Sequence, residues 1–277
     1  MKQLTNDEAK AVSLEILSFI DRICRKLNLK YSLAWGTLIG AVRHHGLIPW
    51  DDDIDVIMPR KDYMKFISYM CENEGTLSPF KLVSIYNRND YFYLVSRVVN
   101  NETMTIPEKK SIQKQKDFGL FVDIYPLDYC GNTYAQATKF FEKQMRVETL
   151  RYMALSDTFQ KAKTSVFRTI IKYPLFMYSK AMGAGFFLRK LEKNINKINE
   201  NDTQYCCSWC GTGGMPATKL VFPSEWFNEL MEVQFEDQYY FIPKHYDEIL
   251  SQVYGDYMSF PPVEEQVGHH YYVAYRK

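Results

Sequence analysis

Apolar residues recur with two different periods along the chain, and these periods predict its secondary structure. Over residues 7–28 the apolar side chains recur every three to four positions, which is the spacing of an amphipathic helix. Thr5 and Glu8 lie three positions apart at its start, a spacing typical of a helix capping box. Shorter apolar runs separated by turn residues follow, up to about residue 130. Strands are predicted at 31–35, 53–58, 80–86, 92–99 and 119–128, and helices at 36–43 and 61–70.

Helical spacing dominates after residue 130. A long helix is predicted at 133–157, and residues 158–200 are mostly helical, with interruptions at Pro174, Gly183 and Gly185. A hairpin and a short helix are predicted near the C-terminus, at 229–243 and 244–256.

Elements that first alternate and then segregate predict an α+β fold, with a mixed core sheet and an appended helical region. Hydrophobic residues make up 46% of the chain, so a sizeable core can form. The catalytic core is predicted at residues 1–130 and a mainly helical region at 131–228. The hairpin, helix and tail at 229–277 are expected to pack back on the core.

Net charge and cysteine content narrow the classes of function. A net charge of +1 argues against nucleic-acid binding driven by bulk charge. No apolar run approaches the ~20 residues that span a bilayer, and the N-terminal segment lacks the apolar core of a signal peptide. The six cysteines are unevenly spaced, which suits reduced thiols. We therefore expect a cytoplasmic protein.

Four aspartates fall within five positions, in the sequence WDDDIDV at residues 50–56. Because side chains two apart on a strand point to the same face, Asp53 and Asp55 are expected to project together, with Cα atoms roughly 7 Å apart. The apolar residues between and after them would face the core. Two carboxylates so placed can bind Mg²⁺, or Mn²⁺, through oxygen. Asp51 and Asp52 are interpreted as turn residues.

A third carboxylate, Asp123, lies in the apolar run FVDIY at residues 121–125. An aspartate in such a run destabilises a strand unless it is paired or binds a metal. The alternative is that residues 51–53 form a solvated turn and that Asp123 forms a salt bridge. Upstream, Gly36 and Thr37 follow a predicted strand and open a helix, a turn whose backbone N–H groups suit a phosphate.

This order of a Gly-Thr turn, an Asp-x-Asp strand and a later aspartate resembles the nucleotidyltransferase superfamily. Within that superfamily three strings more closely resemble the LicD family, which is related to fukutin-type proteins. They are GTLIGAVRHHGLIPWDDDIDVIMPRKDY (36–63), GLFVDIYPLD (119–128) and YGDYMSFPP (254–262), the last followed by HH (269–270). Together they cover roughly fifty of the 277 residues.

The resemblance implies a Mg²⁺-dependent enzyme that moves a phosphate-containing group from a CDP-linked donor to a sugar hydroxyl. Its bacterial members imply phosphocholine, moved from CDP-choline onto a lipid-linked or polymeric glycan precursor of teichoic acid, lipopolysaccharide or capsule. Glycerol or ribitol phosphate is the alternative group. A non-catalytic nucleotide- or glycan-binding protein is the alternative of another class, although the intact Asp-x-Asp sequence argues against it.

Site roles carry over from the resemblance by position. Metal binding and catalysis would fall to Asp53, Asp55 and Asp123, and donor binding to Trp35, Gly36, Thr37 and Arg43. Arg43 would neutralise the donor pyrophosphate or serve as a structural residue at a helix end. Asp52 and Trp50 would support the turn. His269 and His270 would contact phosphate, act in acid–base chemistry or be structural.

A cysteine group lies in CCSWCG at residues 206–211. Cys207 and Cys210 have the spacing of zinc ligands, and Cys206 lies beside them. A tetrahedral zinc site needs a fourth ligand, for which Cys130 or a histidine is the candidate, and no second C-x-x-C is present. The alternative is ordinary reduced and buried thiols.

Residues 158–191 contain seven basic and no acidic residues, interleaved with aromatic and aliphatic ones. This composition suits an interfacial helix on an anionic leaflet, at the inner face of the membrane, which would fit a lipid-linked acceptor. The alternative is an ordinary amphipathic helix with its apolar face in the core. Binding to anionic liposomes that weakens with salt would favour the membrane.

Overall fold

The computed structural model describes residues 1–107, 118–159, 166–209, 215–266, 268 and 272–277. His269, His270 and Cys210 lie outside these residues. The described chain forms two compact units. Residues 1–107, 118–127 and Phe222–Lys277 belong to the first unit, and Asp128–Val221 belong to the second.

The first unit is built on a mixed sheet in which five strands follow the order β2-β3-β7-β5-β4. Only β3 and β7 run parallel along this path, and the other neighbours are antiparallel. The strands are β2 (Ser32–Leu33), β3 (Asp55–Pro59), β4 (Phe80–Val83), β5 (Ser96–Asn100) and β7 (Phe121–Gly131). β3 and β7 are buried along nearly their whole length, so the two parallel strands form the centre of the core.

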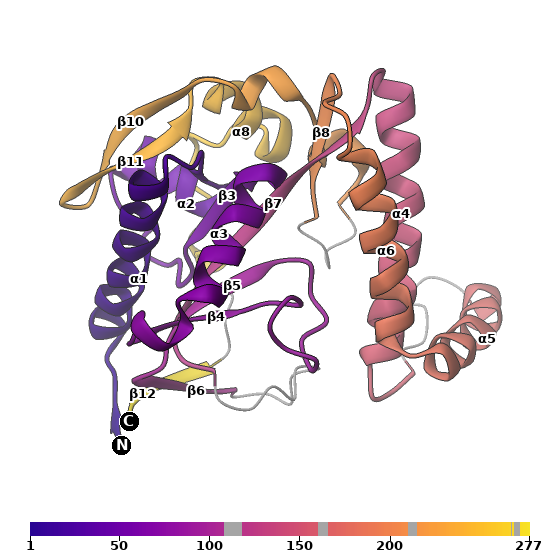
Figure 1. The fold of residues 1–277 in the computed structure, drawn as a ribbon, viewed down its shortest axis with the longest axis horizontal. Helices are drawn as coiled ribbons and strands as arrows, with labels where there is room; N and C mark the ends of the chain where they lie inside the picture. Colours follow the sequence, from indigo (N-terminus) through magenta and orange to yellow (C-terminus); the bar gives the residue numbers. More distant parts are fainter. Residues whose placement is uncertain (108–117, 160–165, 210–214, 267, 269–271) are drawn as a thin grey trace. The chain divides into compact units, whose positions relative to one another are not determined.

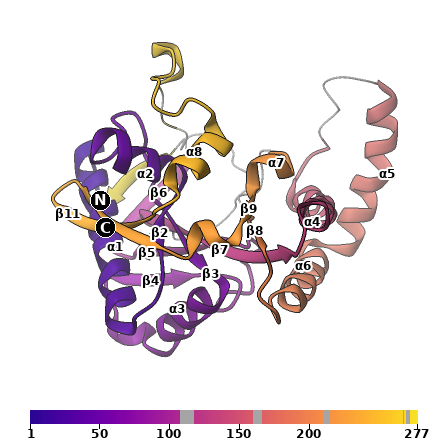
Figure 2. The ribbon, with the colours of Figure 1, turned by 90° about the horizontal axis from the view of Figure 1, so that it is seen from above.

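Two helices pack on one face of this sheet, as Figures 1 and 2 show. α1 (Asn6–Leu27) begins at the predicted capping box, in which Thr5 Oγ1 accepts from the Glu8 N–H. Its apolar stripe, which includes Ile16, Leu17 and Ile20, is buried. α3 (Arg60–Glu72) follows β3 directly, and its packing fixes the far end of that strand.

The remaining elements of the first unit surround the entry to β3. α2 (Trp35–Ile39) continues into a π-helical turn, Gly40–His44. The hairpin β10 (Leu230–Phe235) and β11 (Gln238–Pro243) contacts that turn and β2, and α8 (Tyr246–Tyr254) contacts α2. A three-stranded sheet joins the chain ends, which lie close together in Figure 1. Its strands are β1 (Lys2–Gln3), β6 (Thr103–Pro107) and β12 (Tyr272–Arg276).

The second unit is mainly helical. Its buried contacts include Trp209, which stacks on Phe141 with ring centroids 5.5 Å apart and donates from Nε1 to Asp128. Its helices are α4 (Tyr134–Leu155), α5 (Val166–Met182), α6 (Ala184–Ile198) and α7 (Ala217–Leu220). The strand β8 (Tyr205–Ser208) pairs with β7, and β9 (Val221–Pro223) leads into the first unit.

The α+β prediction is confirmed, and several local predictions are wrong. The strand predicted from residue 53 begins at Asp55, so Asp53 lies in the preceding loop. Pro174 does not interrupt α5, because its fixed φ is helical and the carbonyl it leaves without an N–H lies on an exposed turn. As predicted, the break falls at Gly183, whose φ of 76° only glycine adopts easily. Gly185 does not interrupt a helix, because it lies in the first turn of α6. The tail also contains β12, which was not predicted.

Candidate active site

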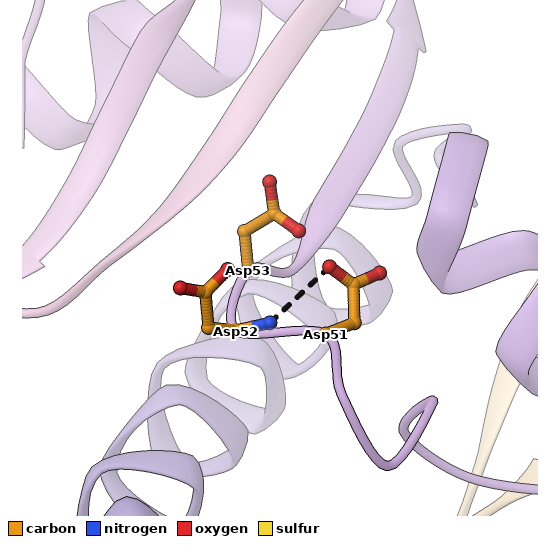
Figure 3. A group of neighbouring side chains, drawn as sticks. All are labelled: Asp51, Asp52 and Asp53. Atoms are coloured by element: carbon orange, nitrogen blue, oxygen red, sulfur yellow. Dashed lines mark hydrogen bonds between the residues drawn. The ribbon is translucent and has the colours of Figure 1, made fainter. Parts of the chain in front are cut away.

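The loop that enters β3 gathers three carboxylates. Oxygen atoms of Asp51, Asp52 and Asp53 lie within 4.8 Å of one another, and Figure 3 shows the three side chains on one short stretch of loop. The Asp52 N–H donates to Asp51 Oδ1 at 3.2 Å. In the described part of the chain this is the group of three acidic side chains close enough to hold one ion. Because Asp53 precedes β3, strand alternation does not determine the direction of its side chain. Asp51 is half-buried rather than fully solvated.

Asp55 and Asp123 lie on the two parallel strands at the centre of the sheet. They are register partners on β3 and β7, and both side chains are buried. The Asp55 N–H donates to Thr37 Oγ1 at 2.9 Å, which fixes the start of β3 against α2. Asp55 Oδ1 is buried and accepts no hydrogen bond from any described residue. A buried carboxylate oxygen without a donor is costly, and a bound cation would satisfy it.

Charge accumulates around these carboxylates. Burial first, and then the charges of Asp53, Asp123 and Asp51, raise the pKa of Asp55 well above its usual range. Burial, with the neighbouring charge of Asp53, raises the pKa of Asp51 to about 7. The folded chain therefore resists full ionisation of the cluster. Oxygen ligands with excess negative charge are the donor set that Mg²⁺ or Mn²⁺ prefers, so the residues fit such an ion.

Arg97 is a buried cation beside this cluster, and sequence reasoning missed it. Arg97 lies on β5, opposite Asp123 of β7, and its Nε donates to Asp123 Oδ1 at 2.7 Å. Its guanidinium carbon lies 4.0 Å from the centre of the Phe121 ring. A charged residue inside the apolar run LVSRVV was the available signal, since a buried arginine needs a partner. The salt bridge foreseen as the alternative for Asp123 is thus present, and metal binding by Asp123 stays a prediction.

A cavity of about 500 Å³ lies beside the carboxylates and brings most of the predicted site residues together. Its wall includes residues of the loop that follows α8, from Asp256 to Pro261. The predicted residues that line it are Trp35, Gly36, Arg43, Trp50, Asp53 and Asp55, with Asp51 beside them. Thr37 and Asp123 do not line it. Asp52 lines a second cavity of about 600 Å³, which shares Trp50 and Asp51 with the first.

Gly36 and Trp35 hold unusual positions in the cavity wall. A Cβ at position 36 would lie 2.5 Å from Asp51 Oδ2, so only glycine allows this approach of α2 to the carboxylate. Trp35 has a φ of 49°, which is rare for a residue with a side chain. Its indole Nε1 is buried without an acceptor among the described residues. An N–H donor in this wall can serve an oxygen of a bound ligand.

Arg43 has a structural role. Its Nη1 donates to the carbonyl oxygens of Tyr257 at 2.6 Å and of Ser259 at 3.0 Å. Its guanidinium carbon lies 4.8 Å from the centre of the Phe260 ring. These contacts join the π-helical turn to the loop after α8. Contact with a donor phosphate stays a prediction.

The described cysteines near the predicted zinc site are thiols in a buried environment. Cys206 and Cys207 are buried, and Cys207 contacts Cys130. Burial, followed by the hydrogen bond with Cys130, raises the pKa of Cys207 well above its usual range, which disfavours the thiolate that zinc requires. The third proposed ligand, Cys210, lies outside the described residues, so zinc stays untested.

Comparison with known proteins identifies the family. The model of the LicD/FKTN/FKRP nucleotidyltransferase domain matches residues 28–156. The chain is 30% identical to the lipopolysaccharide cholinephosphotransferase LicD of Haemophilus influenzae, and the alignment covers 99% of each chain. An uncharacterized protein of Rickettsia typhi is 40% identical over 96 residues, which are 34% of this chain and 29% of that protein. No described helix is both long and apolar enough to cross a membrane. The chain belongs to the LicD family and is a LicD-like phosphotransferase, an enzyme that transfers substituted phosphate groups.

Proposed function

We propose that this enzyme transfers phosphocholine from CDP-choline to a sugar hydroxyl of a cell-surface glycan precursor, with Mg²⁺ as cofactor. One observation carries the proposal. The 500 Å³ cavity has carboxylates at one side, with Asp55 Oδ1 lacking any donor among the described residues, and aromatic rings at another. The first feature suits a cation that binds phosphate, and the second suits choline. The relative from Haemophilus influenzae is named for cholinephosphate transfer to lipopolysaccharide, which supports the same chemistry here.

Asp53 and Asp55 would hold the Mg²⁺ ion. Asp51, close to Asp53, and Asp123, beside Asp55, would be its further carboxylate ligands. When bound, the ion would neutralise charge on the donor diphosphate and orient it. Trp35 Nε1 would donate to a donor oxygen, because its N–H faces no acceptor among the described residues. Arg97 orients the Asp123 carboxylate beside Asp55. Arg97 donates to both oxygens of Asp123. That carboxylate is therefore poorly suited to accept the proton of the acceptor hydroxyl.

The aromatic wall favours choline over glycerol or ribitol. The rings of Trp50 and Phe260 lie 6.1 Å apart, and His44 packs on Phe260 at 5.5 Å. Phe260 is 61% exposed, so its ring is open to a ligand. A quaternary ammonium donates no hydrogen bond and binds aromatic faces, whereas a polyol needs hydrogen-bonding partners.

A donor panel tests the assignment. Thermal unfolding and transfer are measured with CDP-choline, CDP-glycerol and CDP-ribitol, each with and without Mg²⁺. We expect CDP-choline to stabilise the fold most, and only with Mg²⁺ present, because the ion links the carboxylates to the diphosphate. Stabilisation by CDP-glycerol or CDP-ribitol alone would reassign the transferred group. Equal stabilisation with and without Mg²⁺ would contradict the proposal that Mg²⁺ is the cofactor.

The variant Phe260→Leu is expected to weaken the binding of CDP-choline but not that of CDP-glycerol. Leucine keeps an apolar wall but removes the ring face, so KM for CDP-choline should rise about 3- to 30-fold, as expected for the loss of a cation–π contact. The inhibition constant of CDP-glycerol should not change. The matched control is Tyr239→Leu, which removes an exposed ring on the hairpin outside the cavity. If Phe260→Leu weakened the binding of both nucleotides equally, Phe260 would contribute only to the shape of the cavity wall.

A further inference from the structure

Helix α5 of the second unit presents apolar side chains to solvent. Ile170 is 63% exposed, and five more large apolar residues of this helix are at least 43% exposed. These five are Ile171, Tyr173, Leu175, Met177 and Tyr178. Scattered exposed apolar residues are normal, but a contiguous group on one helix marks an interaction surface.

Helix α5 presents a wide apolar face to solvent, although Phe176 on its inner side is half-buried and packs on Phe159 with ring centroids 5.5 Å apart. At about 100° per residue, the six exposed residues and Pro174 between them cover an arc of about 200°. On the opposite side Ser179 is fully buried and its Oγ donates to the Leu175 carbonyl at 2.7 Å. Lys172, on that same side, is half-buried. The apolar face therefore does not pack into the described core, as the ordinary amphipathic alternative had required.

Lys180 is a cation of α5 that lies against the end of α4. Its Nζ donates to the carbonyls of Ala154 at 3.0 Å and of Ser156 at 2.9 Å, at the end of α4. On α6, Arg189 and Lys190 are exposed. Residues 158–191 carry seven basic and no acidic residues, so the region is strongly positive. An apolar face in a positive region is complementary to a surface that is both apolar and anionic.

We propose that the outward face of α5, defined by the six exposed residues, binds the surface of an anionic phospholipid membrane. The helix lies on the surface, since its 17 residues span about 25 Å and no described helix can cross a bilayer. Leucine, isoleucine and methionine would enter the acyl boundary, and the tyrosines and basic residues would meet the headgroups.

A second copy of the chain fits this face less well. A two-fold dimer through α5 would bring two regions with seven positive charges each against one another, which repels. The membrane surface is therefore the favoured occupant. This proposal does not depend on the identity of the donor, because it rests on the second unit alone.

The test is sedimentation of the full-length protein with vesicles. We expect binding to vesicles of equal parts phosphatidylcholine and phosphatidylglycerol at low salt, and little binding to phosphatidylcholine alone. The double variant Ile170→Glu/Met177→Glu places two charges within the face, and should lower the partition coefficient at least about tenfold. The control Met231→Glu/Tyr239→Glu makes the same charge change at exposed apolar residues of the hairpin, and should bind as the wild type does.

A second measurement separates insertion of the face from adsorption by charge alone. In the variant Met177→Trp, brominated lipids should quench the added fluorescence, because residue 177 would lie among the acyl chains. The proposal is overturned if the wild type does not bind anionic vesicles, if the Glu variants bind equally well, or if the introduced indole is not quenched. Light scattering that shows a dimer broken by Ile170→Glu/Met177→Glu would assign the face to a second copy instead.

Discussion

The variant Asp55→Asn is expected to lose phosphate-group transfer by at least about 10³-fold and to raise the melting temperature of the metal-free protein. Activity falls because a Mg²⁺ ligand contributes several kcal/mol to transition-state stabilisation, and each ~1.4 kcal/mol is tenfold in rate. Stability rises because Asp55 is buried beside three other carboxylates and its Oδ1 has no donor among the described residues. The amide of asparagine can donate to these neighbours.

The gain in stability follows from removing an unsatisfied buried polar group. Such a group costs about 1–3 kcal/mol, and each kcal/mol shifts the melting temperature by about 2–4 °C in a protein of this size. Melting in the presence of a chelator measures the shift, and a transfer assay with Mg²⁺ measures the loss. The exposed Asp237 offers a control, since Asp237→Asn should change stability by less than about 0.5 kcal/mol. A destabilised Asp55→Asn protein, or one that retains turnover, would contradict the metal role.

The carboxylate cluster also determines the direction in which the stability of the fold changes with pH. The pKa values of Asp55 and Asp51 are raised in the folded state, so the unfolded chain ionises first as pH rises. Their contribution to stability is present below about pH 4 and is lost as pH rises through the folded pKa, which is about 7 for Asp51. Urea unfolding with a chelator should therefore show the wild type losing stability between about pH 4 and 7 relative to Asp51→Asn/Asp55→Asn. Stabilisation by Mg²⁺ should grow over the same interval, because protons and the ion compete.

The sequence predicts local features of the site better than features that depend on pairing across the sheet. Asp55 was identified because alternation within one strand depends only on near neighbours. The approach of Asp51 to Asp52 and Asp53 was not predicted, because a loop has no period from which side-chain direction follows. Arg97 was missed because its role arises from the antiparallel register of β5 and β7, which join residues 26 positions apart.

The contacts of the cavity wall could not be predicted from the sequence either, because they join residues that lie still farther apart along the chain. Arg43 reaches the carbonyl of Tyr257, 214 residues away, and so brings Phe260 to the carboxylates. Composition indicated many aromatic residues but not which of them meet. The charge and apolar content of residues 158–191 depend on no distant contact, so the sequence alone could raise the membrane hypothesis, which stays a prediction. The assignment of helix α5 then showed that its apolar face points outward.

The variant Arg97→Met is expected to destabilise the fold by about 3–5 kcal/mol at neutral pH. Only 14% of the Arg97 side chain and 9% of the Asp123 side chain are exposed, and breaking a buried pair leaves one charge uncompensated. Here the remaining charge, Asp123, would also face Asp55. Urea unfolding at neutral pH measures the loss.

The double variant Arg97→Met/Asp123→Leu then decides between the two interpretations of Asp123. Replacing both members of a buried pair by apolar residues of similar size is often neutral, so most of the lost stability should return. If Asp123 serves only as the partner of Arg97, the repaired protein should transfer phosphocholine within about tenfold of the wild type. We expect a loss of at least about 100-fold instead, with weaker Mg²⁺ binding in titration, because Asp123 lies beside Asp55 where the ion would sit. A stable and active double variant would restrict Asp123 to the salt bridge and leave the metal to Asp51, Asp53 and Asp55.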